Sequence, residues 1–233
     1  MWPFRRRASA ERERRSELLP PAEARYAVID SELTGLDPQR DSIVSLGGLR
    51  VAHGRIDLGD RFYEEARPAA ALTPTSIVLH GITPEEARGR PDIGGILAGF
   101  AAFCGGDILV GHFLEIDLHF LRKELASSGL PALENPALDT WALYEWLASR
   151  QPQDAGPDLP RVREPRLPEL AQALGVPCRD AHNALDDAFV TAQVFQRLLH
   201  CLPRWGIGTT DALLRIAAPG RGNGHPLSPI PLA

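Results

Sequence analysis

Three strand-like segments open the hydrophobic pattern of the chain. Residues 26–30 form a short apolar run that ends in Asp30, which is typical of a strand buried on both faces. A second strand is predicted over residues 42–51, and the turn residues His53 and Gly54 lead it into a third over residues 55–64. The chain is therefore expected to begin its fold with a meander of three strands.

From Pro84 onward, the spacing of apolar residues becomes helical. Between Pro84 and Phe103, apolar side chains recur on one side of a helical projection. A fourth strand is predicted over residues 107–111, and helices are then predicted over residues 116–128, 140–149, 167–174 and 184–199. Strands first, then helices that alternate with strands, predict an α/β domain with a mixed sheet flanked by helices.

Polar and proline-rich segments divide the chain. Residues 1–24 are polar and carry charges of both signs, so we expect a flexible N-terminal extension there. Prolines crowd residues 152–168, which favours a surface loop, and they recur towards the C-terminus. A single domain is therefore expected over residues 25–203, followed by a short helix and a Pro- and Gly-rich tail over residues 204–233.

The composition narrows the class of protein. The longest uncharged stretch is short and glycine-rich and the N-terminus lacks an apolar run, so we expect neither a membrane span nor a secretory signal. Three scattered cysteines without a CxxC pair argue against a disulfide scaffold or a structural zinc site and favour the reducing cytoplasm. A net charge of −5 argues against a general nucleic-acid coat, but it is compatible with carboxylates gathered around metal ions.

Two carboxylates at the end of the first strand are the first candidates for chemistry. Asp30 and Glu32 are two residues apart, so on a strand their side chains project from the same face. Two neighbouring anions at the end of an apolar strand destabilise the fold unless they share a proton or bind a cation. The alternative is a solvated turn in which Asp30 caps the following loop.

Two further segments place acidic residues near the start of a predicted helix. Asp117 follows the fourth strand, where it is either a functional carboxylate or an ordinary helix N-cap. His182 and Asp187 lead into the last long helix, and His182 is expected on the loop or first turn. The alternative for Asp187 is an acidic residue that the helix dipole favours at a helix N-terminus.

The order of these residues along the chain resembles that of a known enzyme family. Five residues resemble, in order, the catalytic residues of the DnaQ-like 3′–5′ exonucleases of the DEDDh class: Asp30, Glu32, Asp117, His182 and Asp187. The similarity runs from Tyr26 to about Leu202 and includes the segment His80-Gly-Ile-Thr83, a further hallmark of the family.

The resemblance implies a ribonuclease H-like core, which is a five-stranded mixed sheet with helices on both sides. It also implies two divalent cations, Mg²⁺ or Mn²⁺, held by Asp30, Glu32, Asp117 and Asp187. By the same resemblance, His182 is the general base for the attacking water, since an imidazole can take a proton near neutral pH. The implied reaction hydrolyses phosphodiester bonds at single-stranded DNA or RNA 3′ ends and releases nucleoside 5′-monophosphates.

Four residues near these motifs are expected to contact the substrate strand: Leu33, Thr34, His80 and Phe113. Two of them depart from the family pattern, because Leu33 replaces a usual threonine and Phe113 replaces a usual asparagine. Leu33 can pack against a terminal base. Phe113 can stack on a base, or it can simply fill the core.

Other functions stay open on the sequence alone. An apolar residue at position 33 is also typical of the related oligoribonucleases, so short RNA is an alternative substrate. A non-catalytic nucleic-acid-binding or scaffold protein with the same fold is another alternative. A polymerase or another replication or repair protein is a candidate partner, with a short helix predicted within residues 209–217 as a docking element.

Overall fold

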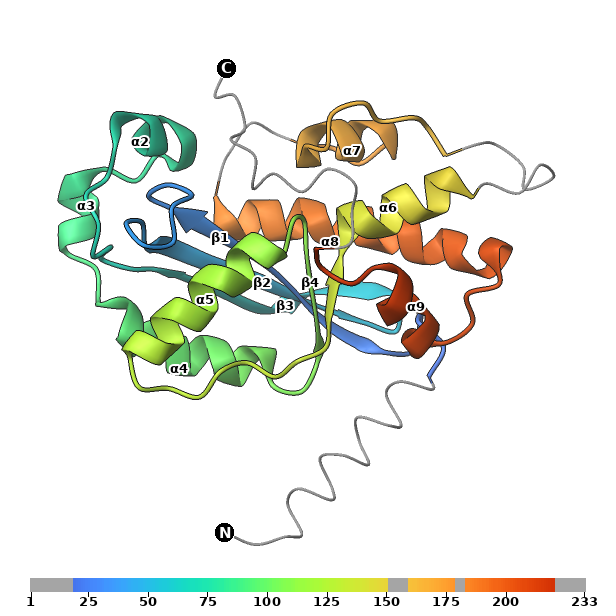
Figure 1. Ribbon diagram of the computed structural model, residues 1–233, viewed down its shortest axis with the longest axis horizontal. Coiled ribbons are helices and arrows are strands. Elements are labelled where there is room, and N and C mark those ends of the chain that lie inside the picture. The colour runs from blue at the N-terminus through green and yellow to red at the C-terminus, as the bar shows by residue number, and fades with distance from the viewer. Residues whose placement is uncertain (1–18, 151–158, 179–182, 221–233) are drawn as a thin grey trace, which may run out of the picture.

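One mixed sheet of five strands forms the centre of the protein (Figure 1). The computed structural model describes residues 19–150, 159–178 and 183–220. The strands have the spatial order β3-β2-β1-β4-β5. Their bounds are β1 (Arg25–Leu33), β2 (Ile43–Ala52), β3 (Arg55–Glu65), β4 (Ile108–Gly111) and β5 (Ala137–Asp139). The first three strands are antiparallel, and β4 and β5 continue the sheet parallel to β1, which confirms the predicted fold class.

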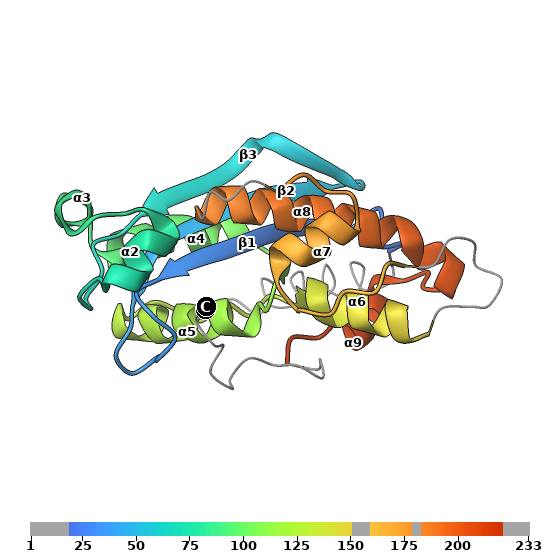
Figure 2. The ribbon, with the colours of Figure 1, turned by 90° about the horizontal axis from the view of Figure 1, so that it is seen from above.

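Alternation along β1 assigns its side chains to two separate cores. Tyr26 and Val28 face one side of the sheet, whereas Ala27 and Ile29 face the other. The first side is covered by α6 (Thr140–Ser149), α7 (Leu167–Ala173), α8 (Ala184–Cys201) and α9 (Thr210–Ile216). The second side is covered by α4 (Ile93–Cys104) and α5 (Glu115–Ser127). Helices therefore lie on both faces of the sheet (Figure 2).

The single helical pattern predicted between Pro84 and Phe103 is wrong in one respect, because it holds two helices. The first is α3 (Pro84–Arg88), and α4 begins after the N-cap Asp92. Between them, the carbonyl of Pro91 accepts the amide of Arg67 at 2.8 Å. This contact to the chain after β3 uses a carbonyl that a continuous helix would need for its own ladder.

Three short elements were not predicted from the pattern: α2 (Pro74–His80), β5 and the 3₁₀ turn η1 (Leu202–Trp205). Both α2 and α3 begin with the same local device, a threonine followed by proline. The Thr73 and Thr83 hydroxyls each accept a backbone amide in the first turn, and each helix also has the reciprocal contact of a capping box.

The two ends of the described chain lie together. The amide of Thr210 donates to the carbonyl of Leu19 at 2.9 Å. The residue after α9 is also held by the sheet, because the carbonyl of Ala217 accepts the amide of Asp139 in β5 at 2.7 Å. Leu213 of α9 is buried in the core beside α8. The expected N-terminal extension and C-terminal tail fall mostly on residues 1–18 and 221–233, outside the described residues. Within the described part of the chain, every helix is too short or too polar to cross a membrane.

Candidate active site

Three predicted carboxylates converge where β1 ends. Asp30 and Glu32 project from the face of β1 that α8 covers, and Asp187 lies in the first turn of α8. One carboxylate oxygen from each of the three lies within 4.8 Å of the others. Figure 1 shows the arrow of β1 ending beside the start of α8. Residues 157 positions apart in the sequence thus form one acidic cluster, defined here as Asp30, Glu32 and Asp187.

A glycine in β2 allows α8 to approach the sheet this closely. Gly47 lies opposite Asp30 in the strand register. A Cβ atom at Gly47 would lie 2.2 Å from the backbone carbon of Ala184 and 2.4 Å from the amide nitrogen of Leu185. No side chain fits there, so the glycine is required for the first turn of α8 to rest on the sheet.

Asp117 approaches the acidic cluster from the opposite face of the sheet. It lies in the first turn of α5, where the N-cap is Leu114, so the N-cap alternative for Asp117 is wrong. The hydroxyl of Ser31, which lies between Asp30 and Glu32 in β1, donates to Asp117 Oδ1. This bond fixes the carboxylate of Asp117 against the strand that carries the other two.

Asp139 holds the start of α5 in place. Its Oδ2 accepts the amide of Leu114 at 2.8 Å, while its Oδ1 caps α6 by accepting the amide of Ala142 at 2.9 Å. One buried carboxylate therefore satisfies the N-termini of two helices. The position of Asp117 follows from this arrangement.

The electrostatics of the site favour bound protons or bound cations. Burial, with repulsion from Asp187 and Asp117, raises the pKa of Glu32 to about 7. Burial likewise raises the pKa of Asp117 to about 7, and the Ser31 hydrogen bond only partly offsets it. The pKa of Asp30 is raised well above its usual range by burial first and then by Asp117, Glu32 and Asp187. Hard carboxylate oxygens of this kind fit a divalent cation such as Mg²⁺ or Mn²⁺.

The structure gives three of the four expected substrate contacts a role within the fold. Leu33 is half-buried and packs against the core formed with α4 and α5. The Thr34 hydroxyl donates to Asp41 at 2.9 Å and accepts the amide of Ser42 at 3.0 Å, which closes the loop after β1. Phe113 is half-buried and packs against the core beside α6, as the core-filling alternative expects, and its contact to a base stays a prediction.

His80 is the fourth expected contact and carries an unused polar atom. Its ring is 7% exposed, and Nδ1 accepts the amide of Ile82 at 3.0 Å. Nε2 is buried and has no hydrogen-bond partner among the described residues. Burial lowers the pKa of His80, so the ring is neutral near pH 7. His182, the predicted general base, lies outside the described residues.

A family model described as "Exonuclease" (RNase_T) matches residues 27–195 of the chain. The chain belongs to this DnaQ-like exonuclease family. It is 31% identical over 192 residues to DNA polymerase III subunit epsilon of Aquifex aeolicus, which covers 82% of this chain and 89% of that protein. It is 32% identical over 184 residues to the PolC-type DNA polymerase III of Thermotoga petrophila, covering 79% of this chain. The chain spans only 12% of the length of that polymerase.

Solved structures of Escherichia coli Exonuclease I have the same fold. The complex with a dT13 oligonucleotide gives a TM-score of 0.69 at 19% identity and covers 79% of this chain and 43% of that chain. A structure described as the zinc ion bound form of the complex with ssDNA gives a TM-score of 0.68, again at 19% identity, and covers 78% of this chain and 42% of that one. At this level of identity, the likeness shows the fold of the exonuclease family and not its substrate.

Three residues that hold the start of α8 in place were missed in the sequence analysis. Asn183 is the N-cap of α8, and Tyr63 and Glu65 of β3 lie behind it. The third predicted strand, residues 55–64, contains Tyr63, but its alternation does not say which helix the face of Tyr63 meets. The strand register supplies the missing information.

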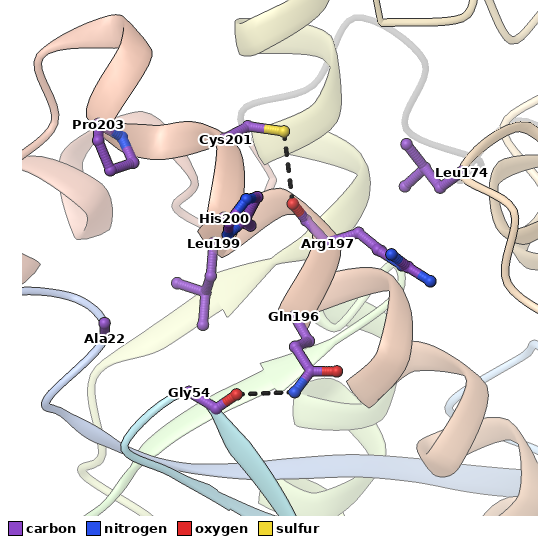
Figure 3. Close-up of a pocket in the computed structure, with 9 residues that line it drawn as sticks. All are labelled: Ala22, Gly54, Leu174, Gln196, Arg197, Leu199, His200, Cys201 and Pro203. Carbon is purple, nitrogen blue, oxygen red and sulfur yellow. Dashed lines mark hydrogen bonds between the residues drawn. The ribbon is translucent and has the colours of Figure 1, made fainter.

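A groove of about 750 Å³ lies at the other end of α8 and is lined by none of the predicted site residues (Figure 3). On its wall, Gln196 Nε2 donates to the carbonyl of Gly54 at 2.7 Å, and Cys201 Sγ donates to the carbonyl of Arg197 at 3.4 Å. The first of these contacts ties α8 to the turn between β2 and β3. The groove is therefore separate from the acidic cluster.

Proposed function

We propose that this protein is a metal-dependent 3′–5′ exonuclease that removes nucleoside 5′-monophosphates from single-stranded nucleic-acid 3′ ends. The convergence of Asp30, Glu32 and Asp187 at one end of the sheet carries the proposal. Membership of the exonuclease family supports it, as do the oligonucleotide complexes of Exonuclease I with the same fold.

Four carboxylates would hold two divalent cations, Mg²⁺ or Mn²⁺: Asp30, Glu32, Asp117 and Asp187. When bound, such ions stabilise the negative charge that develops on the attacking and leaving oxygens of a phosphodiester. His182 would accept the proton of the attacking water on its imidazole ring. Among the described residues, the buried Nε2 of His80 has no hydrogen-bond partner, which supports a role for His80 in contacting the substrate strand.

The domain boundaries and a partner complete the proposal. Residues 25–203 would form most of the exonuclease domain, with residues 1–24 as an extension. Residues 204–233 would form a short helix, which packs on the core of the domain through Leu213, and a tail. Similarity to subunit epsilon and to PolC-type polymerases supports a polymerase or another replication or repair protein as partner.

The test compares the parent protein with Asp30→Ala and His182→Ala on matched DNA and RNA oligonucleotides with free and blocked 3′ ends. We expect Asp30→Ala to lose both Mg²⁺-dependent mononucleotide release and Mn²⁺ binding measured by calorimetry. We expect His182→Ala to lose about a hundredfold or more in turnover while it still binds Mn²⁺. Glu134→Ala, which removes an exposed carboxylate before β5, is the matched control and should behave as the parent.

Parental digestion by folded Asp30→Ala would refute the proposed function. Mn²⁺ binding by a parent protein that digests no oligonucleotide would instead indicate a non-catalytic binding protein. Faster digestion of short RNA than of DNA would indicate the oligoribonuclease-like alternative.

A further inference from the structure

Tyr63 lies on the same face of the sheet as the acidic cluster. Asp30 is opposite Gly47 in the register of β1 and β2, and Gly47 is opposite Tyr63 in the register of β2 and β3. Side chains that are opposite each other in neighbouring strands project from the same face. The carboxyl of Asp30 and the ring of Tyr63 therefore flank the space left by Gly47.

The first turn of α8 occupies this space. Backbone atoms of Ala184 and Leu185 lie where a Cβ of Gly47 would be, so the helix start is seated directly on β2. On the β1 side, the turn presents Asp187 to Asp30 and Glu32. On the β3 side, it presents its N-cap residue, Asn183, to Tyr63. Figure 2 shows α8 lying along this part of the sheet.

The side-chain amide of Asn183 makes two hydrogen bonds, one to the helix α8 and one to Tyr63 of β3. Its Oδ1 accepts the amide of Leu185 at 2.9 Å and so caps the helix. Its Nδ2 donates to the hydroxyl oxygen of Tyr63 at 3.0 Å. The backbone carbonyl of the same Asn183 accepts the amide of Asp187 at 2.9 Å. One residue therefore connects the hydroxyl of Tyr63 to the helix turn that carries a carboxylate of the cluster.

The hydroxyl of Tyr63 is itself held in place by Glu65 and, through Glu65, by Arg90. The hydroxyl donates to Glu65 Oε1 at 2.8 Å, and the guanidinium of Arg90 lies 2.9 Å from the other oxygen of Glu65. Burial, together with Glu65, raises the pKa of Tyr63 above its usual range, so the phenol keeps its proton at neutral pH. The hydroxyl is thus held in the orientation that accepts the amide of Asn183.

We propose that Tyr63 is a positioning residue of the active site. Through Asn183, its hydroxyl fixes the first turn of α8, and this places Asp187 against Asp30 and Glu32. Because Asp187 is the one member of the acidic cluster that does not lie on β1, its position depends on how α8 is seated. The inference rests on the proposed function. It adds to the active site a residue of β3, which lies on the other side of the first turn of α8 from Asp30 and Glu32.

The test removes only the hydroxyl, in Tyr63→Phe. We expect kcat on a single-stranded DNA oligonucleotide to fall about tenfold and Mn²⁺ affinity measured by calorimetry to weaken about tenfold, as for other groups that orient metal ligands. The KM for the oligonucleotide should stay within about twofold, because the strand-binding surface is intact. Tyr26→Phe is the matched control. It loses a hydroxyl bond of 2.7 Å to Pro21 at the opposite end of β1, and it should keep the parental kcat and Mn²⁺ affinity.

A second variant tests the same hydrogen bond from the helix. Asn183→Ser keeps an oxygen that can cap α8 but has no amide to donate to Tyr63. We expect it to match Tyr63→Phe, and we expect the double variant to be no worse than either single one. If Tyr63→Phe does not fold, Asn183→Ser decides alone.

Parental Mn²⁺ affinity in folded Tyr63→Phe, or losses that add in the double variant, would overturn the inference. These outcomes differ from failure of the proposed function, which would show as parental activity in Asp30→Ala. An inactive Asp30→Ala together with a parental Tyr63→Phe would therefore refute only the role of Tyr63.

Discussion

At the scale of single residues, Phe113 has a backbone conformation that residues other than glycine seldom adopt. Its φ is 55°, in the left-handed region that costs about 1–2 kcal/mol for most residues. The ring centroid lies 4.7 Å from that of His112 and 6.3 Å from that of Trp141. Aromatic packing therefore offsets a strained backbone at the residue that links β4 to α5, the helix that carries Asp117.

This strain predicts an unusual order of stability among variants. Phe113→Ala and Phe113→Gly both lose the ring, but only glycine adopts a positive φ without strain. We expect Phe113→Gly to be more stable than Phe113→Ala by about 1 kcal/mol in urea unfolding. The control is Ala102→Gly on the exposed side of α4, where glycine should destabilise by about 1 kcal/mol. A Phe113→Gly variant less stable than Phe113→Ala would contradict strain at this position.

The carboxylates of the site were predictable residue by residue, whereas their neighbours were not. Alternation along β1 predicts that Asp30 and Glu32 share a face, and the structure confirms it. By the same alternation Ser31 faces the other side, where it bonds Asp117. The bond between Tyr63 and Asn183 joins residues 120 apart, and only the strand register and the seating of α8 bring them together.

At the scale of elements, the prediction was accurate for the long elements and for the short β4 and α7, and it missed the short α2, β5 and η1. The long apolar segments that became β1, α5, α6 and α8 were found within a few residues of their bounds. The strand β5 has three residues, too few to show alternation, and it owes its place to pairing with β4. The helix α2 has seven residues, and capping at Thr73 rather than apolar periodicity defines its start.

The contact between α8 and β2 is the element-level feature on which the acidic cluster depends. In Gly47→Ala, the new methyl would meet the backbone of Ala184 and Leu185, and neither atom belongs to a flexible side chain. We expect the start of α8 to shift, at a cost of about 1–3 kcal/mol in the free energy of unfolding. Mn²⁺ binding should weaken as well, because Asp187 moves away from β1.

The matched control for this substitution is Gly95→Ala in α4, where a Cβ meets no atom within 4 Å. There the same change should leave Mn²⁺ affinity unchanged and stabilise the helix by up to about 1 kcal/mol. Urea unfolding and calorimetry on both variants check the prediction. Parental stability and Mn²⁺ affinity in Gly47→Ala would show that the helix start is not seated as described.

At the scale of the whole molecule, the site concentrates most of the net charge of the protein. The formal net charge is −5, and the carboxylates of Asp30, Glu32, Asp117 and Asp187 contribute four of these negative charges. The rest of the chain is almost neutral. This distribution supports the proposed capture of a strand end through cations, rather than salt-sensitive coating of long nucleic acid.

The same concentration of charge links stability to pH when metal is absent. The pKa of Glu32 and that of Asp117 are each raised to about 7 by burial, so the folded protein binds more protons than the unfolded chain above about pH 4. Stability that protonation provides at low pH is therefore lost as pH rises towards 7. Divalent cations act in the opposite sense, because they bind the deprotonated carboxylates.

We therefore expect the free energy of unfolding in the presence of a chelator to be lower at pH 8 than at pH 5 by several kcal/mol. The Glu32→Gln variant, which keeps the shape of the side chain but does not titrate, should lose a large part of this difference. Glu134→Gln, at an exposed site, should keep it. Saturating Mn²⁺ should restore stability at pH 8 in the parent, since a ligand that binds only the folded state stabilises it. Urea titrations at the two pH values measure each quantity, and an equal pH dependence in the parent and in Glu32→Gln would show that this carboxyl does not titrate with the raised pKa.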